Sequence, residues 1–300
     1  MKGAEIAAKM GLSPSAPPTL RESQRYCRRL ARRHYENFTV ASRLLPGRLR
    51  QHVCNLYAYC RWADDLADEV GDAGRSLDLL DWWESQLHDC FGGRATHPVF
   101  IALAETIRQY QLPAEPFLDL LAAFRQDQRI ARYETTEAIL DYCRHSANPV
   151  GRLVLHLGEC CTPERAAWSD SICTGLQLTN FCQDVARDWD RGRIYLPLTA
   201  CRQFGYEEAM FAGRTCNEAF GRLLAAQVDQ AEGWLRGGMP LVASLPAGLR
   251  LAVALFLQGG LATLKVIRRQ NYDVWTRRPT LSKFDKGRLL AGWWWKLRQS

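Results

Sequence analysis

Apolar residues recur every three or four positions along nearly the whole chain, and this spacing restricts the fold more than any other feature. Such a period places them on one face of an α-helix. Pro and Gly mark the breaks, as at Leu45-Pro46-Gly47 and Gly237-Gly238, and no strand-like alternation stands out. The sequence therefore predicts an all-α fold. Helices are expected at Arg21–Glu36, Gly47–Val70, Ser76–Phe91, Pro98–Gln111, Glu115–Asp127, Thr136–Leu157 (with a kink at Asn148-Pro149), Pro163–Trp189, Cys216–Arg236, Gly248–Arg269 and Lys283–Leu297.

Length and charge set broad limits. The chain has 300 residues, 47% of them hydrophobic, so it can bury the core of one large helical domain or two smaller ones. The net charge of +7 suits anionic lipid, a phosphorylated substrate and nucleic acid about equally. The clusters Arg28-Arg29, Arg32-Arg33 and Arg277-Arg278 are short and lack a nucleic-acid-binding module. We expect no nucleic-acid partner, and prefer a solvated face or an anionic membrane surface for these arginines.

Cysteine usage predicts a cytoplasmic protein. Eleven cysteines, an odd number, are spread from Cys27 to Cys216 without a CxxC motif, which favours reduced thiols over disulfides.

The apolar stretch Leu251–Leu264 is shorter than the roughly 18 residues of a membrane span, so we expect a buried core helix there. The cluster Trp293–Trp295 has the composition of a membrane-interface anchor, and packing against the body explains it about equally well. Peripheral contact with the inner face of the membrane therefore stays open.

The stretch YAYCRWADDLADE, residues 57–69, places two carboxylates one helical turn apart. Asp64 and Asp68 are four residues apart, so on a helix they share a face and lie close enough to share a cation. Arg61 precedes Asp64 by three residues and adds a positive group on much the same face. This layout suits a phosphate bridged by a metal ion. Taken alone, such a pair is more often part of a solvated helix face.

A second polar stripe favours a metal site over a solvated helix face. In LQLTNFCQDVARDWDRGRIYLP, residues 176–197, Gln177, Asn180, Asp184 and Asp188 follow one another at steps of three, four and four. They form one stripe on an otherwise apolar helix, which is costly to bury unless something satisfies it. Two acidic pairs facing each other across a helical bundle would attract a hard divalent cation, and Mg²⁺ is the natural candidate because it prefers oxygen ligands and phosphates. No His/Cys pattern indicates zinc.

These two motifs resemble the aspartate-rich motifs of the squalene/phytoene synthase family, the head-to-head isoprenoid synthases. HYENFTVASRLLP at residues 34–46 is similar to the opening motif of that family, and NYDVWTRRPTLSKFDK at 271–286 is similar to its closing one. Order and spacing agree along most of the chain. The resemblance implies an isoprenoid-synthase fold: a single-domain helical bundle around a central apolar cavity, spanning residues 21–300 after a flexible leader at 1–20.

The resemblance also implies roles for individual residues. Metal ligands would be Asp64, Asp68, Asp184 and Asp188, which would hold the cofactor Mg²⁺. Catalytic residues would be Tyr57, Arg61, Gln177 and Asn180, with Arg61 contacting the diphosphate oxygens and the other three lining the reacting end. Substrate-binding residues would be His34, Asn37, Phe38, Arg61, Gln183, Arg193 and Tyr272. Asp65 matches too, but a step of one residue turns it partly away, so it ranks lower. Taken alone, His34 would be interpreted as a core histidine, and only its place in the opening motif makes it a candidate.

Two departures from the family pattern indicate one branch. Condensing members usually carry Asn-Ile-Leu-Arg-Asp where this chain has Asn180-Phe181-Cys182-Gln183-Asp184, so a neutral Gln183 replaces an arginine. Asn37 also stands where condensing members more often have Ser. Both resemble the bacterial hydroxysqualene synthases of hopanoid biosynthesis, which ionise presqualene diphosphate and capture the cation with water. The alternatives are a synthase condensing two prenyl diphosphates (to presqualene diphosphate, squalene or phytoene) and, lower, a non-catalytic helical assembly factor.

Overall fold

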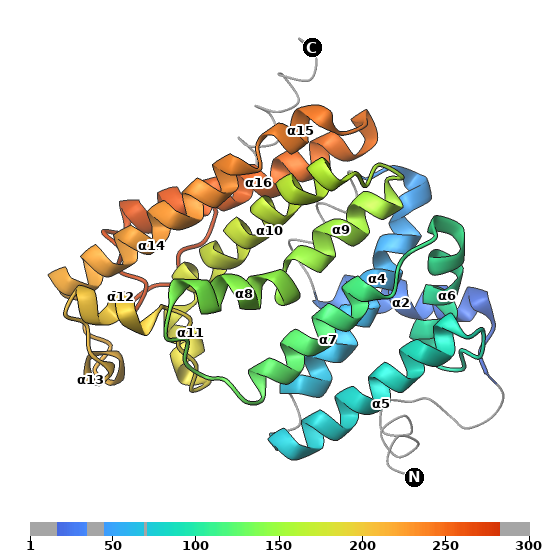
Figure 1. The fold of residues 1–300 in the computed structure, drawn as a ribbon, viewed down its shortest axis with the longest axis horizontal. Coiled ribbons are helices and arrows are strands. Elements are labelled where there is room, and N and C mark those ends of the chain that lie inside the picture. The colour runs from blue at the N-terminus through green and yellow to red at the C-terminus, as the bar shows by residue number, and fades with distance from the viewer. Residues whose placement is uncertain (1–16, 35–44, 69–70, 283–300) are drawn as a thin grey trace. The chain divides into compact units, whose positions relative to one another are not determined.

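The computed structural model describes residues 17–34, 45–68 and 71–282, and these form an all-α protein (Figure 1). The predicted fold class is confirmed, since no strand occurs in the described ranges apart from an isolated bridge between Arg132 and Ile194. The helices are α2 (Leu20–His34), α4 (Gly47–Asp68), α5 (Ala73–Phe91), α6 (Pro98–Tyr110), α7 (Glu115–Asp127), α8 (Thr136–Ser146), α9 (Asn148–Leu157), α10 (Pro163–Gln183), α11 (Val185–Asp190), α12 (Leu198–Gln203), α13 (Glu208–Ala212), α14 (Glu218–Gly237), α15 (Pro240–Ser244) and α16 (Ala247–Arg269).

Two helices predicted as continuous are each divided. The kink expected at Asn148-Pro149 is a break between α8 and α9, and Pro149 falls in the first turn of α9, where its missing N–H leaves no hydrogen bond unmade. The prediction of one helix over Pro163–Trp189 is wrong. Asp184, with φ −106° and ψ 15°, separates α10 from α11, and its side chain makes no capping hydrogen bond to the backbone there. The predicted helix at Lys283–Leu297 lies outside the described residues.

The chain divides into two compact units, which we describe separately. The first comprises Met1–Arg129 with His156–Glu159, and the second comprises Ile130–Leu155 with Cys160–Ser300. In the first unit, α4 packs against α2, α5, α6 and α7. Its core is aromatic, because Trp62 and Trp83 stack with ring centroids 5.2 Å apart. Burial lowers the pKa of the adjacent His97 to about 3, so its ring stays neutral among them. The predicted single-domain span and the central cavity stay predictions.

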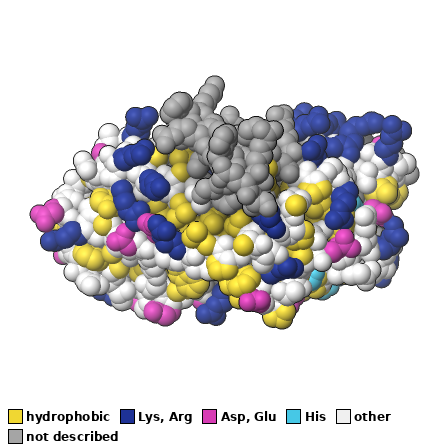
Figure 2. Space-filling model, turned by 90° about the horizontal axis from the view of Figure 1, so that it is seen from above, with side chains coloured by type: hydrophobic (Ala, Val, Ile, Leu, Met, Phe, Trp, Pro, Cys, Tyr) yellow, Lys and Arg dark blue, Asp and Glu magenta, His cyan; other side chains and the backbone are white. Residues whose placement is uncertain are grey.

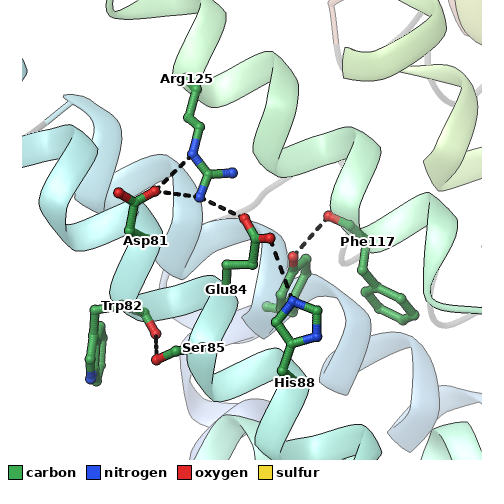
Figure 3. A network of polar contacts seen from close by, with 8 residues as sticks. Asp81, Trp82, Glu84, Ser85, His88, Phe117 and Arg125 are labelled. Atoms are coloured by element: carbon green, nitrogen blue, oxygen red, sulfur yellow. Dashed lines mark hydrogen bonds and ion pairs between the residues drawn. The ribbon is translucent and has the colours of Figure 1, made fainter.

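Polar contacts fix α4, α5 and α7 of the first unit against one another (Figure 3). Arg125 of α7 donates through Nε (3.1 Å) and Nη2 (2.7 Å) to Asp81 Oδ1 of α5, and its Nη2 also lies 2.6 Å from Glu84 Oε2. The buried Tyr59 of α4 donates its hydroxyl to the Phe117 carbonyl at 2.9 Å. Because Tyr59 is fully buried, this bond fixes the rotation of α4 about its axis. The direction in which the carboxylates at the end of α4 point is therefore fixed as well.

In the second unit, α10 is central and packs against α8, α14, α15 and α16. Close approach to α14 depends on Gly175, because a Cβ there would lie 2.7 Å from the backbone nitrogen of the buried Leu235. α16 is the one described helix long and apolar enough to span a membrane by length and composition. Ala254, Leu264 and Ile267 are fully buried, whereas Phe256 is 42% exposed, so α16 buries one face and not the whole surface expected of a core helix.

We predict that Gly175→Ala destabilises the protein by about 2 kcal/mol. Alanine usually stabilises a helix interior relative to glycine by up to ~1 kcal/mol, but here overlap with Leu235 outweighs that gain, since overpacking costs about 1–3 kcal/mol. Denaturant unfolding measures the difference. The control is Gly233→Ala in α14, where the added Cβ meets nothing within 4 Å, so that variant should be neutral or slightly more stable. Equal effects of the two substitutions would contradict the packing argument.

Candidate functional site

The first acidic motif lies at the end of α4. One face of this helix is buried through Tyr59, Trp62 and Leu66, which leaves Arg61, Asp64 and Asp68 on less buried positions. Asp68 is exposed, and the Asp64 side chain keeps 44% of its surface accessible. The i,i+4 spacing therefore presents both carboxylates at a surface where a cation can reach them.

Arg61 joins two carboxylates of this motif. Its Nη1 lies 3.0 Å from Asp64 Oδ2, and its Nη2 forms an ion pair with Asp65 Oδ1. Burial alone would lower the pKa of Arg61, but the charges of Asp65 and Asp64 outweigh it, so the pKa of Arg61 is raised. The Asp65 side chain is only 15% exposed. Sequence reasoning gave Asp65 a low rank because of its direction, and missed that it anchors Arg61 from the position i+4.

The second acidic motif extends across the break between α10 and α11. The Asp184 N–H donates to the Asn180 carbonyl at 2.8 Å, and the Asp188 N–H donates to the Asp184 carbonyl at 2.9 Å. Helical i,i+4 bonds thus continue through the break and keep Asn180, Asp184 and Asp188 in one row. The predicted stripe persists, although it extends over two helices and not one. The Arg193 N–H donates to the Asp188 carbonyl at 2.8 Å, which fixes the turn after α11.

The closing segment after α16 braces this second motif. Arg278 donates to both oxygens of Asp184, from Nε at 2.5 Å and from Nη2 at 2.8 Å. Those hydrogen bonds raise the pKa of Arg278 above its ordinary value. The Gln183 side-chain amide donates to the Pro279 carbonyl. Sequence reasoning missed Arg278 as a site residue and treated it as part of a surface cluster, because the two partners are 94 residues apart.

The other predicted site residues have varied positions. Tyr57 on α4 and Gln177 on α10 are half-buried, whereas Asn180 is exposed. Tyr272 has a left-handed backbone, with φ 63°, and lines an open hollow of about 600 Å³ with residues of α14. His34 is the last residue of α2. Asn37 and Phe38 lie outside the described residues.

The chemistry of the donors fits Mg²⁺ held together with a phosphate. Each motif offers two carboxylates one turn apart, Asp64 with Asp68 in the first unit and Asp184 with Asp188 in the second. Within the described part of the chain, no group of three or more His, Cys, Asp or Glu side chains is arranged to hold a metal. Mg²⁺ is commonly bound by one or two carboxylates, with waters and substrate phosphates completing its shell. Each pair matches that minimal donor set.

The motifs and the fold lead to a family. The family model described as squalene/phytoene synthase matches residues 31–285. The chain belongs to the squalene/phytoene synthase family. Among solved structures, the squalene synthase HpnC from Alicyclobacillus acidocaldarius is 45% identical, with a TM-score of 0.81, and the match covers 84% of this chain and 95% of that one. A dehydrosqualene synthase in complex with ligand is 26% identical, with a TM-score of 0.85 and coverage of 94% and 98%. The fold is that of the isoprenoid synthases.

Curated members of the squalene/phytoene synthase family with different activities are similar to the chain. The hydroxysqualene synthase of Rhodopseudomonas palustris is 35% identical over 213 residues, covering 70% of this chain and 71% of that protein. The phytoene synthase of Arthrospira platensis is 30% identical over 283 residues, covering 90% and 92%. The family acts on prenyl diphosphates, and these two matches leave the branch to be argued from residues.

Proposed function

We propose that this protein is a Mg²⁺-dependent hydroxysqualene synthase, which converts presqualene diphosphate and water to hydroxysqualene and diphosphate. Two likenesses support this branch: the 45% identity to the HpnC squalene synthase and the 35% identity to the hydroxysqualene synthase of Rhodopseudomonas palustris. Both exceed the 30% identity to the phytoene synthase. The match to the hydroxysqualene synthase is shorter than the match to the phytoene synthase, however, so the identities alone do not carry the proposal.

The observation that carries it is the environment of Gln183. Condensing members of the family usually have an arginine here, which suits enzymes that bind two diphosphates. In this chain the neutral side chain donates from its amide to the Pro279 carbonyl, so one of its hydrogen bonds is made within the protein. Arg278, the residue before Pro279, donates hydrogen bonds to Asp184. With no charge at position 183, a single diphosphate is the simpler substrate.

Under this proposal, Asp64 with Asp68 and Asp184 with Asp188 would hold Mg²⁺, which when bound would neutralise the charge that develops on the leaving diphosphate. Arg61, Arg193 and Tyr272 contact the diphosphate oxygens, and charge-assisted hydrogen bonds from arginine suit them best. Asp65 helps by fixing the Arg61 guanidinium, with which it forms an ion pair. Gln183 supports the second motif by holding the closing segment in place.

We propose Tyr57, Gln177 and Asn180 as the residues of the reacting end, and His34, Asn37 and Phe38 of the opening motif as substrate-binding residues. A tyrosine ring stabilises a carbocation through its π face without a nucleophile or a proton-transfer dyad. The amides of Gln177 and Asn180 would add polar groups to the reacting end. The carbon–oxygen bond to diphosphate breaks, the cyclopropane opens, and water supplies the new hydroxyl and loses one proton.

A head-to-head condensing activity is the second candidate. The nearly full-length match to the phytoene synthase of Arthrospira platensis, covering 90% of this chain, favours it, as does the TM-score of 0.85 to a dehydrosqualene synthase. A non-catalytic assembly factor ranks below both, because all four metal-binding aspartates are present. A cytoplasmic location, and work alongside other enzymes of squalene and hopanoid synthesis, belong to the same proposal.

One assay separates the two candidate reactions. Pure protein is incubated with Mg²⁺ and either presqualene diphosphate or farnesyl diphosphate, and the products are identified by mass spectrometry. We expect presqualene diphosphate to yield a C30 alcohol carrying the oxygen of ¹⁸O-labelled water, and farnesyl diphosphate to remain unconsumed. Conversion of farnesyl diphosphate alone to a C30 product would overturn the branch assignment. Geranylgeranyl diphosphate is the parallel control for a phytoene synthase.

A further inference from the structure

Helix α2 has two contrasting faces. Ser23, Cys27 and Ala31, spaced by four residues, are buried. The exposed side chains on the rest of the helix are mostly basic, at Arg21, Arg25, Arg29, Arg32 and Arg33. Arg21, Arg25 and Arg29 are four residues apart, and Arg32 and Arg33 follow Arg29 by three and four residues. All five therefore lie in one row along the helix. We call this row the α2 arginine row. With Arg28, the helix carries six arginines against one glutamate.

The members of the α2 arginine row lack the ion pairs that several other exposed arginines form, and unlike Arg75, Arg129, Arg269 and Arg277, which are also exposed without an ion pair in the described part of the chain, they are grouped on one helix face. Elsewhere, Arg94 pairs with Asp89 at 2.8 Å, Arg144 with Asp141 at 3.0 Å and Arg222 with Glu218 at 3.4 Å. Across the described ranges, no carboxylate forms an ion pair with any member of the row. The single acid of α2, Glu22, accepts hydrogen bonds from the backbone N–H and hydroxyl of Thr19. Like charges at i,i+4 repel, so the row carries a cost that an anionic partner would remove.

The row cannot turn toward the protein for neutralisation. Trp62 Nε1 of α4 donates to the Tyr26 hydroxyl of α2 at 2.9 Å, and Gln51 Nε2 donates to the Gln24 carbonyl at 3.2 Å. Arg28, which is half-buried, donates to the Gln51 side chain. These bonds, together with the buried face, fix the rotation of α2 on α4. The arginine row is therefore a preformed, rigid basic surface.

We propose that the α2 arginine row docks the protein on anionic phospholipid membrane surfaces. A straight row of cations on a rigid helix complements a flat sheet of negative headgroups, and each basic residue near such a surface adds to binding. Leu20, 40% exposed at the start of α2, adds an apolar side chain that the interface can accept. Figure 2 shows a group of Lys and Arg side chains along one edge of the drawn face.

The partner class follows from charge and geometry. The family acts on prenyl diphosphates, whose hydrocarbon chains partition into bilayers, so a membrane is where such a substrate is concentrated. Nucleic acid also carries dense negative charge, but a protein that reads it normally has a recognisable module. The docking proposal does not require the hydroxysqualene reaction, because lipid binding is measured without substrate.

The test is co-sedimentation with vesicles. We expect the wild-type protein to bind vesicles of phosphatidylcholine with about 30% phosphatidylglycerol and not to bind vesicles of pure phosphatidylcholine. About 0.5 M salt should release the bound protein, because salt screens the charges. The triple variant Arg21→Gln, Arg25→Gln, Arg29→Gln should bind the mixed vesicles on the order of 100-fold more weakly, since each basic residue is worth about a factor of five at such a surface. Arg32 and Arg33 are kept because they adjoin the opening motif.

A matched control removes the same charge elsewhere. Arg94→Gln, Arg144→Gln and Arg222→Gln together also remove three exposed arginines, and binding should change less than threefold. Unchanged circular dichroism and melting temperature of the α2 variant show that it is folded. No binding by the wild-type protein, or equal losses in the two triple variants, would overturn the proposal. Loss of binding to a DNA duplex in the α2 variant, with vesicle binding unaffected, would identify a nucleic-acid surface and overturn it as well.

Discussion

Replacing Asp64 or Asp184 by Asn is expected to reduce turnover of the prenyl diphosphate by about 10³-fold, or ~4 kcal/mol of transition-state stabilisation. Asparagine keeps the size and one oxygen but removes the negative charge that a hard cation requires. Both aspartates accept hydrogen bonds from an arginine, so each variant also releases one guanidinium. The measurement is kcat with presqualene diphosphate over a range of Mg²⁺ concentrations.

The controls are Asp89→Asn and Asp190→Asn. Each removes one exposed carboxylate that pairs with an arginine, Arg94 or Arg214, in the same unit as the tested aspartate. Asp190 lies in α11 only two residues after Asp188, so it matches the local backbone closely. Both controls should stay within twofold of wild type. Undiminished turnover in the Asp64 or Asp184 variant would rule out that motif as a metal site.

A direct binding measurement accompanies the kinetics. Addition of Mg²⁺ with inorganic diphosphate should raise the melting temperature of the wild-type protein, because a ligand that binds only the folded state stabilises it. The Asp64→Asn and Asp184→Asn variants should lose that shift. This result does not depend on which prenyl diphosphate is the substrate, so it tests the metal site even if the proposed reaction is wrong.

Local features of the fold and the site were predictable from the sequence. The helix over Gly47–Asp68 and the contact between Arg61 and Asp64 follow from spacing along a single helix. Apolar periodicity does not show a one-residue break such as that at Asp184, because the row of side chains continues through it. The short helices α12, α13 and α15, of five or six residues, are also too short to show a period.

Contacts between distant segments were not predictable from spacing. The pair of Arg278 with Asp184 and the bond from Gln183 to Pro279 join residues 94 and 96 positions apart. Nothing in the local sequence around Arg277-Arg278 shows which arginine binds a distant carboxylate and which one faces solvent. The difference depends on where the chain returns after α16, which tertiary packing decides. The same holds for the α2 arginine row: its basic residues are plain in the sequence, but the absence of ion pairs to them in the described ranges is not.

Replacing Arg278 by Gln is expected to change two affinities in opposite directions. Arg278 places a positive charge within 3 Å of both oxygens of Asp184, and this charge opposes a dication on the same carboxylate. A unit charge and a dication about 5 Å apart interact by roughly 7 kcal/mol at an effective dielectric of 20. The Arg278 side chain is 33% exposed, so we discount this to about a factor of ten. Mg²⁺ alone should bind the variant about tenfold more tightly.

Diphosphate should show the opposite change under the proposed function. An anion that binds next to Asp184 through Mg²⁺ is attracted by the Arg278 guanidinium, so diphosphate with saturating Mg²⁺ should bind the variant about tenfold more weakly. Titration calorimetry measures both affinities, and KM for the prenyl diphosphate should rise with the second. Arg278→Lys keeps the charge but loses the two-pronged bond to Asp184, so it should leave the Mg²⁺ affinity nearly unchanged and weaken diphosphate binding only in part.

Arg187→Gln is the matched control for this prediction. Arg187 lies 3.7 Å from the same Asp184 oxygen, but its side chain is 65% exposed, so solvent screens its charge and both affinities should change less than threefold. A purely structural role for Arg278 would weaken both affinities together, because a displaced Asp184 serves neither ligand. Opposite shifts have a different meaning. They show that the closing segment sets the charge of the second acidic motif, and that Arg278 makes this motif favour a cation that arrives with its diphosphate over a cation alone.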